Sequence, residues 1–410
     1  MMTLQNKKIL LIIGGGISAY KSLDLIRLLI RKKSSVKVVL TKSGKKFVTA
    51  LSISSLLKNK VFEEMFEDKN RGKIDHISLS RWADLVLVLP ATANFMSKLS
   101  RGGADDLAST IALASNKEIF LAPAMNVRMW LHKATQKNLK SLIEYGYKFI
   151  GPENGTMACG EYGKGKMSSP RQILSFLERF FKNKDYLKRK KINAIVTSGP
   201  TKEYIDPVRY ISNESSGKQG YEIALELSRL GIKTTLVSGP TNINYNKDIK
   251  IKKVVSGNQM LSAVKKSLPA DIAVCTAAVS DFKPSFLIKK NKIKKDEKFD
   301  EIKIKKNIDI LNFLGTNNRY KPKLLVGFSA ETENLIKNSI KKMEEKFCDM
   351  MIANDVSKPD FGFNKDQNEV TIIDKNGKTE KIRKSSKKFI ASVVARKIVE
   401  TFLSNEKKLN

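Results

Sequence analysis

The chain has 410 residues, 41% of them hydrophobic and 29% charged, which suits a folded protein of two or three domains and excludes a disordered one. Its formal net charge is +35, but arginine supplies only 14 of the 76 basic residues and the lysines are spread along the chain, so solvated faces explain the charge better than nucleic-acid binding. Three cysteines with no C-x-x-C motif and only two histidines exclude a disulfide framework, a cysteine-rich zinc site and a multi-histidine metal centre.

The sequence contains no segment suited to a membrane. No apolar run approaches the ~18 residues that a transmembrane helix requires. The apolar run at 9–13 stops at three glycines, so it is too short for a secretory signal and predicts a first strand instead. We therefore expect a cytoplasmic protein without a membrane segment.

The first half of the chain alternates apolar strands with helical stretches. Strands are predicted at 8–13, 36–41, 85–90 and 119–122, and helices at 18–31 and 104–115. This alternation predicts βαβ units around a parallel sheet. A polar and strongly basic stretch at 182–191 follows, and we place a domain boundary at about 185–191.

The second half repeats the same alternation. Strands are predicted at 192–197, 234–237, 271–276, 324–328 and 350–353, and helices near 218–230, 258–268, 334–346 and 387–403. The sequence therefore predicts an α/β protein with two doubly wound domains, residues 1–185 and 191–410.

Two turns in the first half end predicted strands and are rich in small or polar residues. The glycines at 14–16 and Ser18 open a helix, where backbone N–H groups and the helix dipole favour a phosphate. Their spacing is neither G-x-G-x-x-G nor a Walker loop, so a plain strand-to-helix turn explains them equally well. The turn Pro-Ala-Thr-Ala-Asn at 90–94 lies where doubly wound sheets bind ligands.

Three side chains of this half could carry chemistry. His76 lies just before a predicted strand, and a structural role is the commoner one for a lone histidine. Asn126 directly follows a strand and could simply cap a helix. Cys159 lies in a glycine-rich segment at 155–167, which we expect to be a mobile flap whose lysines lower the thiol pKa.

Six motifs of the first half, in order and at the right spacing, resemble the flavin-dependent phosphopantothenoylcysteine decarboxylases over residues 7–180. They are Gly-Gly-Ile-Ser-Ala-Tyr-Lys at 15–21, His76, the turn at 90–94, Ala-Asp-Asp-Leu at 104–107, Pro-Ala-Met-Asn-x-x-Met-Trp at 123–130 and Ala-Cys-Gly at 158–160. The resemblance implies a flavodoxin-like, Rossmann-like domain that binds FMN and assembles as trimers. It implies FMN contacts from Gly15, Gly16, Ser18, Thr41, Thr92 and Asn94, and catalytic roles for His76, Asn126 and Cys159, with Cys159 donating a proton.

The second half contains a polar connection of over twenty residues, at 197–218, and connections of that length are usually functional. A second turn, at 276–282, ends a strand with small residues and Asp281, which can hold a metal ion. Lysines alternate at 289–295 and 303–306, which indicates either a solvated hairpin or a clamp for a triphosphate. The other two cysteines, Cys275 and Cys348, lie in or beside apolar strands, where a free cysteine behaves as a small hydrophobic residue.

The second half resembles the phosphopantothenate–cysteine ligases over residues 191–402. The shared motifs are Asp-Pro-Val-Arg-Tyr-Ile-Ser-Asn, Ala-Ala-Val-x-Asp-Phe, Lys-Ile-Lys-Lys, Gly-Phe-Ser-Ala-Glu-Thr and Ala-Asn-Asp-Val. The resemblance implies catalytic roles for Arg209, Asn213 and Lys292, and a metal ligand in Asp281. It implies CTP contacts from Cys275, Thr276, Ala277, Asp281, Lys292, Ile308, Asp309, Ile310, Leu311, Phe328, Lys342 and Lys346. The chain departs from the family at Glu214, Gln219 and Ile308, where the family has His, Met and Pro, and the last change puts the shape of that turn in doubt.

The two resemblances in this order are typical of the bifunctional proteins of coenzyme A biosynthesis. They imply that CTP and Mg²⁺ drive the condensation of 4′-phosphopantothenate with L-cysteine through an acyl-cytidylate, followed by FMN-dependent decarboxylation to 4′-phosphopantetheine. They also imply a homo-oligomer, with trimers of the first domain and dimers of the second forming a dodecamer, and no nucleic-acid or membrane partner.

Two other functions are compatible with parts of the sequence. A nicotinamide-dependent oxidoreductase would have G-x-G-x-x-G and an acidic residue after the second strand, where this chain has Thr41-Lys42-Ser43. A basic nucleic-acid-binding protein without catalysis would leave the polar segment at 197–218 and the Cys159 segment without a purpose. A bound yellow chromophore separates the first alternative from the flavoprotein, and steep salt-dependent DNA binding without turnover would identify the second.

Overall fold

The computed structural model describes residues 3–65, 75–246, 249–286, 288, 290–294, 301–357 and 366–408. The chain divides into two compact units, Met1–Asn183 and Lys184–Asn410. The division falls within helix α8 (Pro170–Arg189), so the basic stretch that begins at 182 continues a helix and is not a linker. Leu177 and Phe181 of this helix, one turn apart, are buried in the core of the first unit, and Leu187 is buried in that of the second.

The first unit is built on a six-stranded parallel sheet with the order β3-β2-β1-β4-β5-β6. Its strands are β1 (Lys8–Ile13), β2 (Ser35–Leu40), β3 (Val61–Phe62), β4 (Leu85–Ala91), β5 (Glu118–Pro123) and β6 (Lys148–Phe149). An antiparallel hairpin, β7 (Glu153–Thr156) and β8 (Tyr162–Lys166), follows the sheet. The helices are α1 (Lys21–Arg31), α2 (Ala50–Leu57), α3 (Asp75–Trp82), α4 (Ala93–Ser100), α5 (Leu107–Ala114), α6 (Val127–Leu131), α7 (Lys133–Glu144) and α8, with short 3₁₀ turns at Ile17–Tyr20 and Gly44–Lys46.

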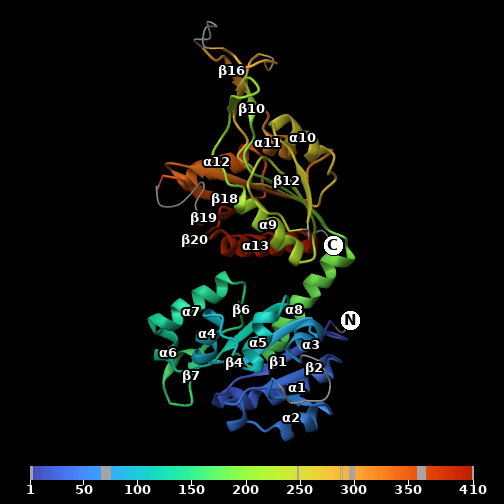
Figure 1. The fold of residues 1–410 in the computed structure, drawn as a ribbon, viewed down its shortest axis with the longest axis vertical. Helices are drawn as coiled ribbons and strands as arrows, with labels where there is room; N and C mark the ends of the chain where they lie inside the picture. The colour runs from blue at the N-terminus through green and yellow to red at the C-terminus, as the bar shows by residue number, and fades with distance from the viewer. Residues whose placement is uncertain are drawn as a thin grey trace. The chain divides into compact units, whose positions relative to one another are not determined.

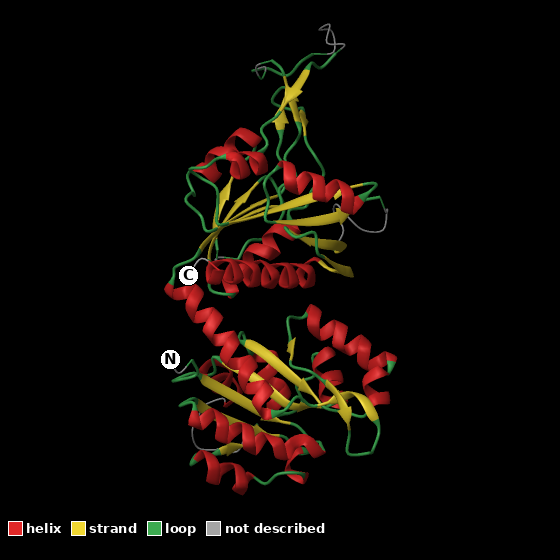
Figure 2. Cartoon of the chain, turned by 180° about the vertical axis from the view of Figure 1, so that it is seen from behind, coloured by secondary structure: helices red, strands yellow, loops and turns green. Residues whose placement is uncertain are grey.

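Both faces of this sheet are covered by helices (Figures 1 and 2). Along β1, Ile9, Leu11 and Ile13 belong to one buried cluster with residues of α1 and α8. The alternate residues, Leu10 and Ile12, belong to another cluster with residues of α4 and α5. A strand buried on both faces is apolar throughout, which is why its sequence predicted it clearly.

The second unit has an eight-stranded sheet with the order β13-β12-β9-β14-β17-β18-β19-β20, parallel as far as β18 and antiparallel beyond it. Its strands are β9 (Asn193–Ser198), β12 (Lys233–Ser238), β13 (Lys250–Lys253), β14 (Ile272–Cys275), β17 (Leu324–Glu331), β18 (Met350–Asp355), β19 (Gln367–Asp374) and β20 (Thr379–Ser386). Two small antiparallel hairpins pair β10 (Glu203–Tyr204) with β11 (Tyr210–Ile211), and β15 (Phe282–Pro284) with β16 (Ile304–Lys306). The helices are α9 (Lys218–Arg229), α10 (Gly257–Lys265), α11 (Ile310–Thr316), α12 (Leu335–Glu345) and α13 (Lys387–Lys408).

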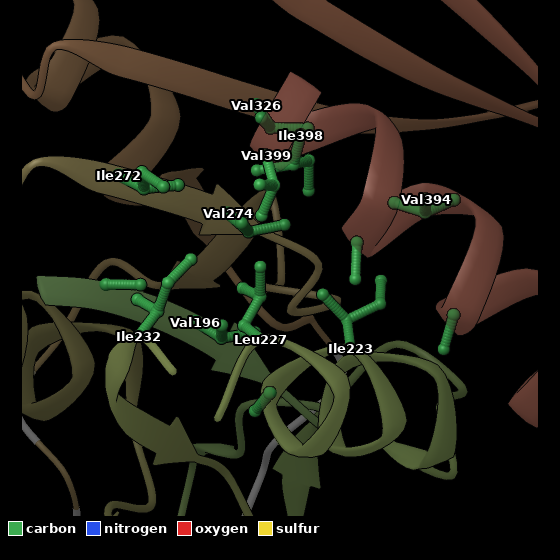
Figure 3. Close-up of a cluster of buried hydrophobic side chains, with 14 of the residues drawn as sticks. Val196, Ile223, Leu227, Ile232, Ile272, Val274, Val326, Val394, Ile398 and Val399 are labelled. Carbon is green, nitrogen blue, oxygen red and sulfur yellow. The ribbon is translucent and has the colours of Figure 1, made fainter. Parts of the chain in front are cut away.

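Helices α9 and α13 cover one face of the second sheet. Figure 3 shows Ile223 and Leu227 of α9, and Val394 and Ile398 of α13, gathered against strand residues such as Val274. Residues of α10, α11 and α12 form a separate buried cluster on the alternate strand positions. The predicted α/β fold with two Rossmann-like domains is confirmed. In each unit, the six parallel strands of the main sheet, numbered by their order along that unit, are arranged 3-2-1-4-5-6.

Two local predictions were wrong. His76 does not lie directly before a strand, because it belongs to helix α3, whose remaining turns separate it from β4. The segment at 197–218 is not one open loop, because it contains the β10–β11 hairpin. Among the helices of the described ranges, none is both long and apolar enough to cross a bilayer.

Candidate functional sites

The first unit has a cavity of about 1130 Å³. It is lined by residues that follow the carboxyl ends of β1, β2, β4 and β5, and by the β7–β8 hairpin. The sheet reverses its strand order between β1 and β4, and ligands bind doubly wound sheets at such a reversal. All six residues predicted to contact a cofactor line the cavity, as do Asn126 and Cys159.

Packing explains two of the three glycines in the first turn. A side chain on Gly14 would overlap the Pro90 carbonyl oxygen, and one on Gly15 would overlap Ser43. Gly16 has more room, since an added Cβ would lie 3.6 Å from Pro90 Cγ. The first two glycines therefore pack directly against their neighbours, whereas the third position could accept a Cβ in ordinary van der Waals contact with Pro90 and Thr92.

Two of the predicted cofactor residues already have structural hydrogen bonds. The Thr41 hydroxyl donates to the Ile13 carbonyl (3.0 Å) and accepts the Gly44 N–H (3.1 Å). Thr92 caps helix α4 by accepting the Phe95 N–H (3.2 Å). In the described part of the chain, the side chains of Ser18 and Asn94 have no hydrogen-bond partner, so they remain available to a ligand.

Asn126 joins a helix to the hairpin. Its amide oxygen caps α6 by accepting the Arg128 N–H (2.7 Å) and the Met129 N–H (3.4 Å). Its amide nitrogen donates to the Glu161 carboxylate and lies 3.5 Å from Cys159 Sγ. Both the capping role and the proximity to Cys159 are therefore present in one side chain.

Cys159 is exposed at the turn of the β7–β8 hairpin. The turn is closed by backbone hydrogen bonds between Met157 and Glu161 (2.9 Å) and between Gly160 and Met157 (3.0 Å). The predicted glycine-rich segment forms this hairpin, and the described polar partner of the Cys159 sulfur is Asn126. Its mobility and the influence of its lysines on the thiol stay predictions.

The cavity wall also carries a charged cluster of one lysine and two aspartates, and the sequence did not predict that these residues pair. The Lys98 ammonium lies 2.7 Å from Asp105 Oδ1 and 2.6 Å from Asp106 Oδ2. Burial alone would lower the pKa of Lys98, but hydrogen bonds to these carboxylates outweigh burial and raise it. The sequence signal was the Asp-Asp pair of the motif at 104–107, which resemblance marked without assigning it a role.

His76 stands apart from this cavity, because it is not among the residues that line it. Its Nδ1 atom is buried and has no hydrogen-bond partner among the described residues. Of the three predicted catalytic groups, a single chain therefore brings together Asn126 and Cys159 only.

In the second unit, the corresponding reversal of strand order lies between β9 and β14. The buried carboxylate of Asp206 accepts the N–H groups of Val208 (2.8 Å), Arg209 (2.7 Å) and Ile293 (3.3 Å). The Arg209 guanidinium donates to Asp206 Oδ2 (2.9 Å) and to the Ile293 carbonyl (3.2 Å). These hydrogen bonds hold Arg209 against Ile293, which directly follows Lys292 in the chain.

Asn213 and Asp281 are joined through the turn after β14. The Asn213 amide donates to the Val279 carbonyl (3.1 Å). The Asp281 carbonyl accepts the Asn307 N–H (2.8 Å), which ties this turn to the start of the predicted 308–311 segment. Thr276 donates its hydroxyl to the Thr197 carbonyl (2.6 Å), and Ala277 N–H reaches Thr197 Oγ1 (3.3 Å).

The apolar residues predicted to contact CTP are divided between the buried clusters on the two faces of the second sheet. Ile308, Ile310, Leu311, Cys275 and Ala277 belong to one apolar cluster, whereas Phe328 packs against the cluster on the other face of the sheet. Asp309 caps α11 by accepting the Asn312 N–H (2.8 Å), so this turn enters a helix normally with isoleucine in place of the family's proline.

The predicted lysines differ in their surroundings. Lys346 pairs with Asp309 at 2.9 Å, and Lys342 lies one helical turn before it on α12. Lys292 is exposed and has no ion-pair partner among the described residues, while Lys289 and Lys295 lie outside those residues. The described residues contain no group of three His, Cys, Asp or Glu side chains that could hold a metal ion, so Asp281 would need ligands from a substrate.

The two cysteines of this unit fit the role of small hydrophobic residues. Burial raises the pKa of the Cys275 thiol strongly, and burial raises that of Cys348 to about 12. Both remain neutral thiols near neutral pH.

Asp206→Asn should loosen the hairpin that carries Arg209. Burial alone would raise the pKa of Asp206, but its N–H donors and Arg209 outweigh burial and lower it. The ionised carboxylate therefore stabilises the fold above the unfolded-state pKa, about 3.9, and this stabilisation is lost as pH falls through the lower folded-state pKa. In the full-length protein, amide exchange at Val208, Arg209 and Ile293 should be several-fold faster in the variant at pH 7. The difference should shrink below about pH 4. Equal protection in both proteins at pH 7 would contradict this account.

Comparisons with known proteins cover both units. A family model described as "Flavoprotein" matches residues 2–182, and one described as "DNA/pantothenate metabolism flavoprotein C-terminal domain" matches residues 188–402. The coenzyme A biosynthesis bifunctional protein of Haemophilus influenzae is 40% identical over 402 residues, covering 98% of this chain and 99% of that protein. The Bacillus subtilis protein of the same name is 39% identical, covering 91% and 92% of the two chains. A crystal structure of the C-terminal domain of such a protein is 34% identical with a TM-score of 0.44, covering 52% of this chain and 96% of that one.

Proposed function

Because the chain belongs to the family of bifunctional coenzyme A biosynthesis proteins, we propose that residues 1–185 decarboxylate 4′-phosphopantothenoylcysteine with FMN and that residues 191–410 join 4′-phosphopantothenate to L-cysteine with CTP. The chain is thus a bifunctional enzyme, a flavoprotein decarboxylase and a ligase. The observation that carries the first assignment is the cavity at the strand-order reversal, which collects the glycine turn, Asn126 and Cys159.

The residues of this cavity fit FMN. Gly16 lines the cavity at the end of the first turn, Ser18 and Asn94 offer unpartnered side chains, and Lys21 and Lys42 on the wall can offset a phosphate charge. When bound, FMN supplies reversible two-electron oxidation and reduction, chemistry that no side chain of the protein provides.

The chain's own groups position the substrate and move a proton. The Asn126 amide, held in place by its capping bonds, holds the hairpin through Glu161 and lies beside the Cys159 sulfur. Loss of CO₂ leaves electron density on a carbon that must gain a proton, and the exposed Cys159 thiol at the cavity wall is placed to donate it.

We propose a homo-oligomer, because one chain's cavity lacks His76. If His76 acts on the substrate thiol or carboxylate, it must come from a neighbouring copy, which supports trimers of the first domain. Dimers of the second domain, a dodecamer and a cytoplasmic location are parts of the same proposal.

In the ligase domain, the carboxylate of 4′-phosphopantothenate attacks the α-phosphorus of CTP, which releases pyrophosphate and forms an acyl-cytidylate. The cysteine amine then displaces CMP. Arg209 and Asn213, fixed by Asp206 and Val279, position the acid and its activated form. Lys292, Lys342 and Lys346 would offset charge on the phosphates, and Asp281 would hold Mg²⁺, which would neutralise further phosphate charge.

The purified full-length protein should be yellow, with the absorption spectrum of an oxidised flavin. When the halves are expressed separately, the colour should stay with residues 1–185, because the cavity lies wholly within the first unit. A first half that is colourless and still decarboxylates would refute the FMN assignment.

The function as a whole is tested by incubating the protein with 4′-phosphopantothenate, cysteine, CTP and Mg²⁺, followed by mass spectrometry. The expected product is 4′-phosphopantetheine, with 4′-phosphopantothenoylcysteine appearing first. Replacing CTP by ATP should reduce the yield strongly, and equal yields would overturn the choice of nucleotide.

A further inference from the structure

Strand β8 meets the segment after β5 with one face, and that face carries few side chains. An added Cβ on Gly165 would overlap the Met125 carbonyl oxygen, and the Gly165 carbonyl accepts the Met125 N–H (3.1 Å). An added Cβ on Gly163 would lie 3.1 Å from the Val127 side chain. Successive residues of a strand alternate between its faces, so Glu161 shares this face with the two glycines. Glu161 therefore brings a carboxylate into a contact that is otherwise made by glycines.

The position of Glu161 is fixed by its backbone and by its side chain. Its carbonyl accepts the Met157 N–H (2.9 Å), which continues the hairpin pairing beyond β8. Its carboxylate accepts a hydrogen bond from the Asn126 amide nitrogen and lies 3.5 Å from the Arg128 Nε atom. The Arg128 side chain is 89% exposed, so solvent screens the ion pair and leaves it weak. The hydrogen bond from Asn126 is the stronger contact, because its acceptor is charged.

The Asn126 amide nitrogen also lies 3.5 Å from Cys159 Sγ. An amide nitrogen carries two hydrogens, so one can be donated to Glu161 and the other to the sulfur. The amide oxygen is already occupied by the N–H groups of Arg128 and Met129. With the oxygen held by α6 and one hydrogen held by Glu161, the plane of the amide is fixed and its second hydrogen faces the sulfur.

We propose that Glu161 is a positioning residue for the proton transfer assigned to Cys159, and that it acts through the Asn126 amide. Glu161 is not among the residues that line the cavity, whereas Asn126 and Cys159 are, so its effect on the reaction must pass through a neighbour. This role rests on the proposed decarboxylase function.

The bonds that change in this step show what the amide contributes. The S–H bond of Cys159 breaks and a C–H bond forms on the substrate carbon, while the substrate regains the two electrons that it gave to FMN earlier. The sulfur is left as a thiolate and later takes a proton from solvent. The second Asn126 N–H can donate to this thiolate in a charge-assisted hydrogen bond, which requires the orientation that Glu161 maintains.

The test compares the full-length wild type with Glu161→Met, which removes the acceptor at a similar side-chain length, and with Glu161→Gln, which keeps an acceptor oxygen. Mass spectrometry of the products of 4′-phosphopantothenoylcysteine gives the ratio of 4′-phosphopantetheine to the product that is two hydrogens lighter. This ratio should fall about ten- to a hundred-fold in Glu161→Met, because the last proton transfer loses a hydrogen bond to a charged group while the earlier steps continue. Glu161→Gln should keep most of the wild-type ratio.

Two further measurements separate positioning from a merely structural role. Arg128→Gln removes the other partner of Glu161 and should keep the wild-type ratio. Unfolded molecules form neither product, so a loss of folded protein would lower both products together and leave the ratio unchanged. Amide exchange at Met125, which reports the docking of the hairpin, should be similar in all variants because Gly163 and Gly165 still pack against the segment.

Several results would overturn this role. One is an equal product ratio in Glu161→Met and the wild type, and another is an equal fall of the ratio in Glu161→Met and Glu161→Gln or Arg128→Gln. Much faster exchange at Met125 in Glu161→Met would attribute the effect to undocking instead. If Glu161→Met does not fold, Glu161→Ala removes the same acceptor and takes its place. A wild type that releases no CO₂ refutes the proposed function and this role with it, whereas an unchanged ratio with normal CO₂ release refutes the role alone.

Discussion

Cys159→Ser should release CO₂ from 4′-phosphopantothenoylcysteine and still fail to make 4′-phosphopantetheine. The thiol is exposed at the hairpin turn and is assigned the proton transfer that follows decarboxylation, so its loss should leave the earlier steps running. The accumulated product should be two hydrogens lighter than 4′-phosphopantetheine, because the substrate would give two electrons to FMN before CO₂ leaves and would regain them only together with the proton from Cys159. Mass spectrometry of the products, with CO₂ measured in parallel, provides the readout.

Tyr162→Phe is the matched control for this variant, since Tyr162 lies on the same hairpin and is 76% exposed. It should make 4′-phosphopantetheine at the wild-type rate. If Cys159→Ser prevents reduction of the flavin altogether, the thiol acts before CO₂ leaves and the assigned order is wrong.

Lys292→Gln should slow acyl-cytidylate formation by about ten- to a hundred-fold. The reason is that the variant loses one charge-assisted contact to the phosphates, and such a contact is worth ~1.5–3 kcal/mol. The side chain is exposed and lacks an ion-pair partner in the described ranges, so its ammonium is free to approach a triphosphate. The Arg209–Ile293 hydrogen bond holds the neighbouring backbone, so the effect should not arise from lost structure. Pyrophosphate release without cysteine measures this step.

Lys290→Gln provides the comparison, because Lys290 is exposed, lies two residues away and is assigned no contact. It should behave like the wild type, and both variants should keep full decarboxylase activity. If the two variants release pyrophosphate equally fast and near the wild-type rate, these lysines are a solvated face and the triphosphate is bound elsewhere.

The elements with strong periodic patterns could be predicted from the sequence. Strand β1 is buried on both faces and is therefore apolar at five consecutive positions, while α9 follows a glycine and carries apolar residues at helical spacing. Helix α8 was not predicted, and its last turns are rich in lysine, where Phe181 and Leu187 are buried in different cores and give no single apolar stripe. Lysine is common in both helices and loops, so a lysine-rich composition does not distinguish a helix from a loop at the end of α8.

The candidate sites were predictable to the extent that their residues are contiguous. The glycine turn and the 90–94 turn each form a motif, and the parallel sheet brings the two motifs together. The contact of Asp206 with Ile293 joins residues 87 positions apart, and nothing local in the sequence marks it. Lys98 and its two aspartates were missed because their pairing depends on how α4 and α5 pack.

The two ends of the Asn126 amide leave this position without a conservative replacement. Aspartate would still cap α6, but it would place a second carboxylate against Glu161. Serine and threonine could cap the helix but are too short to reach the hairpin as well, and glutamine is one methylene too long for the cap. Asparagine offers an acceptor and a donor at this reach, so we expect these replacements at position 126 to lose either the cap of α6 or the hydrogen bond to Glu161, before any catalytic cost is counted.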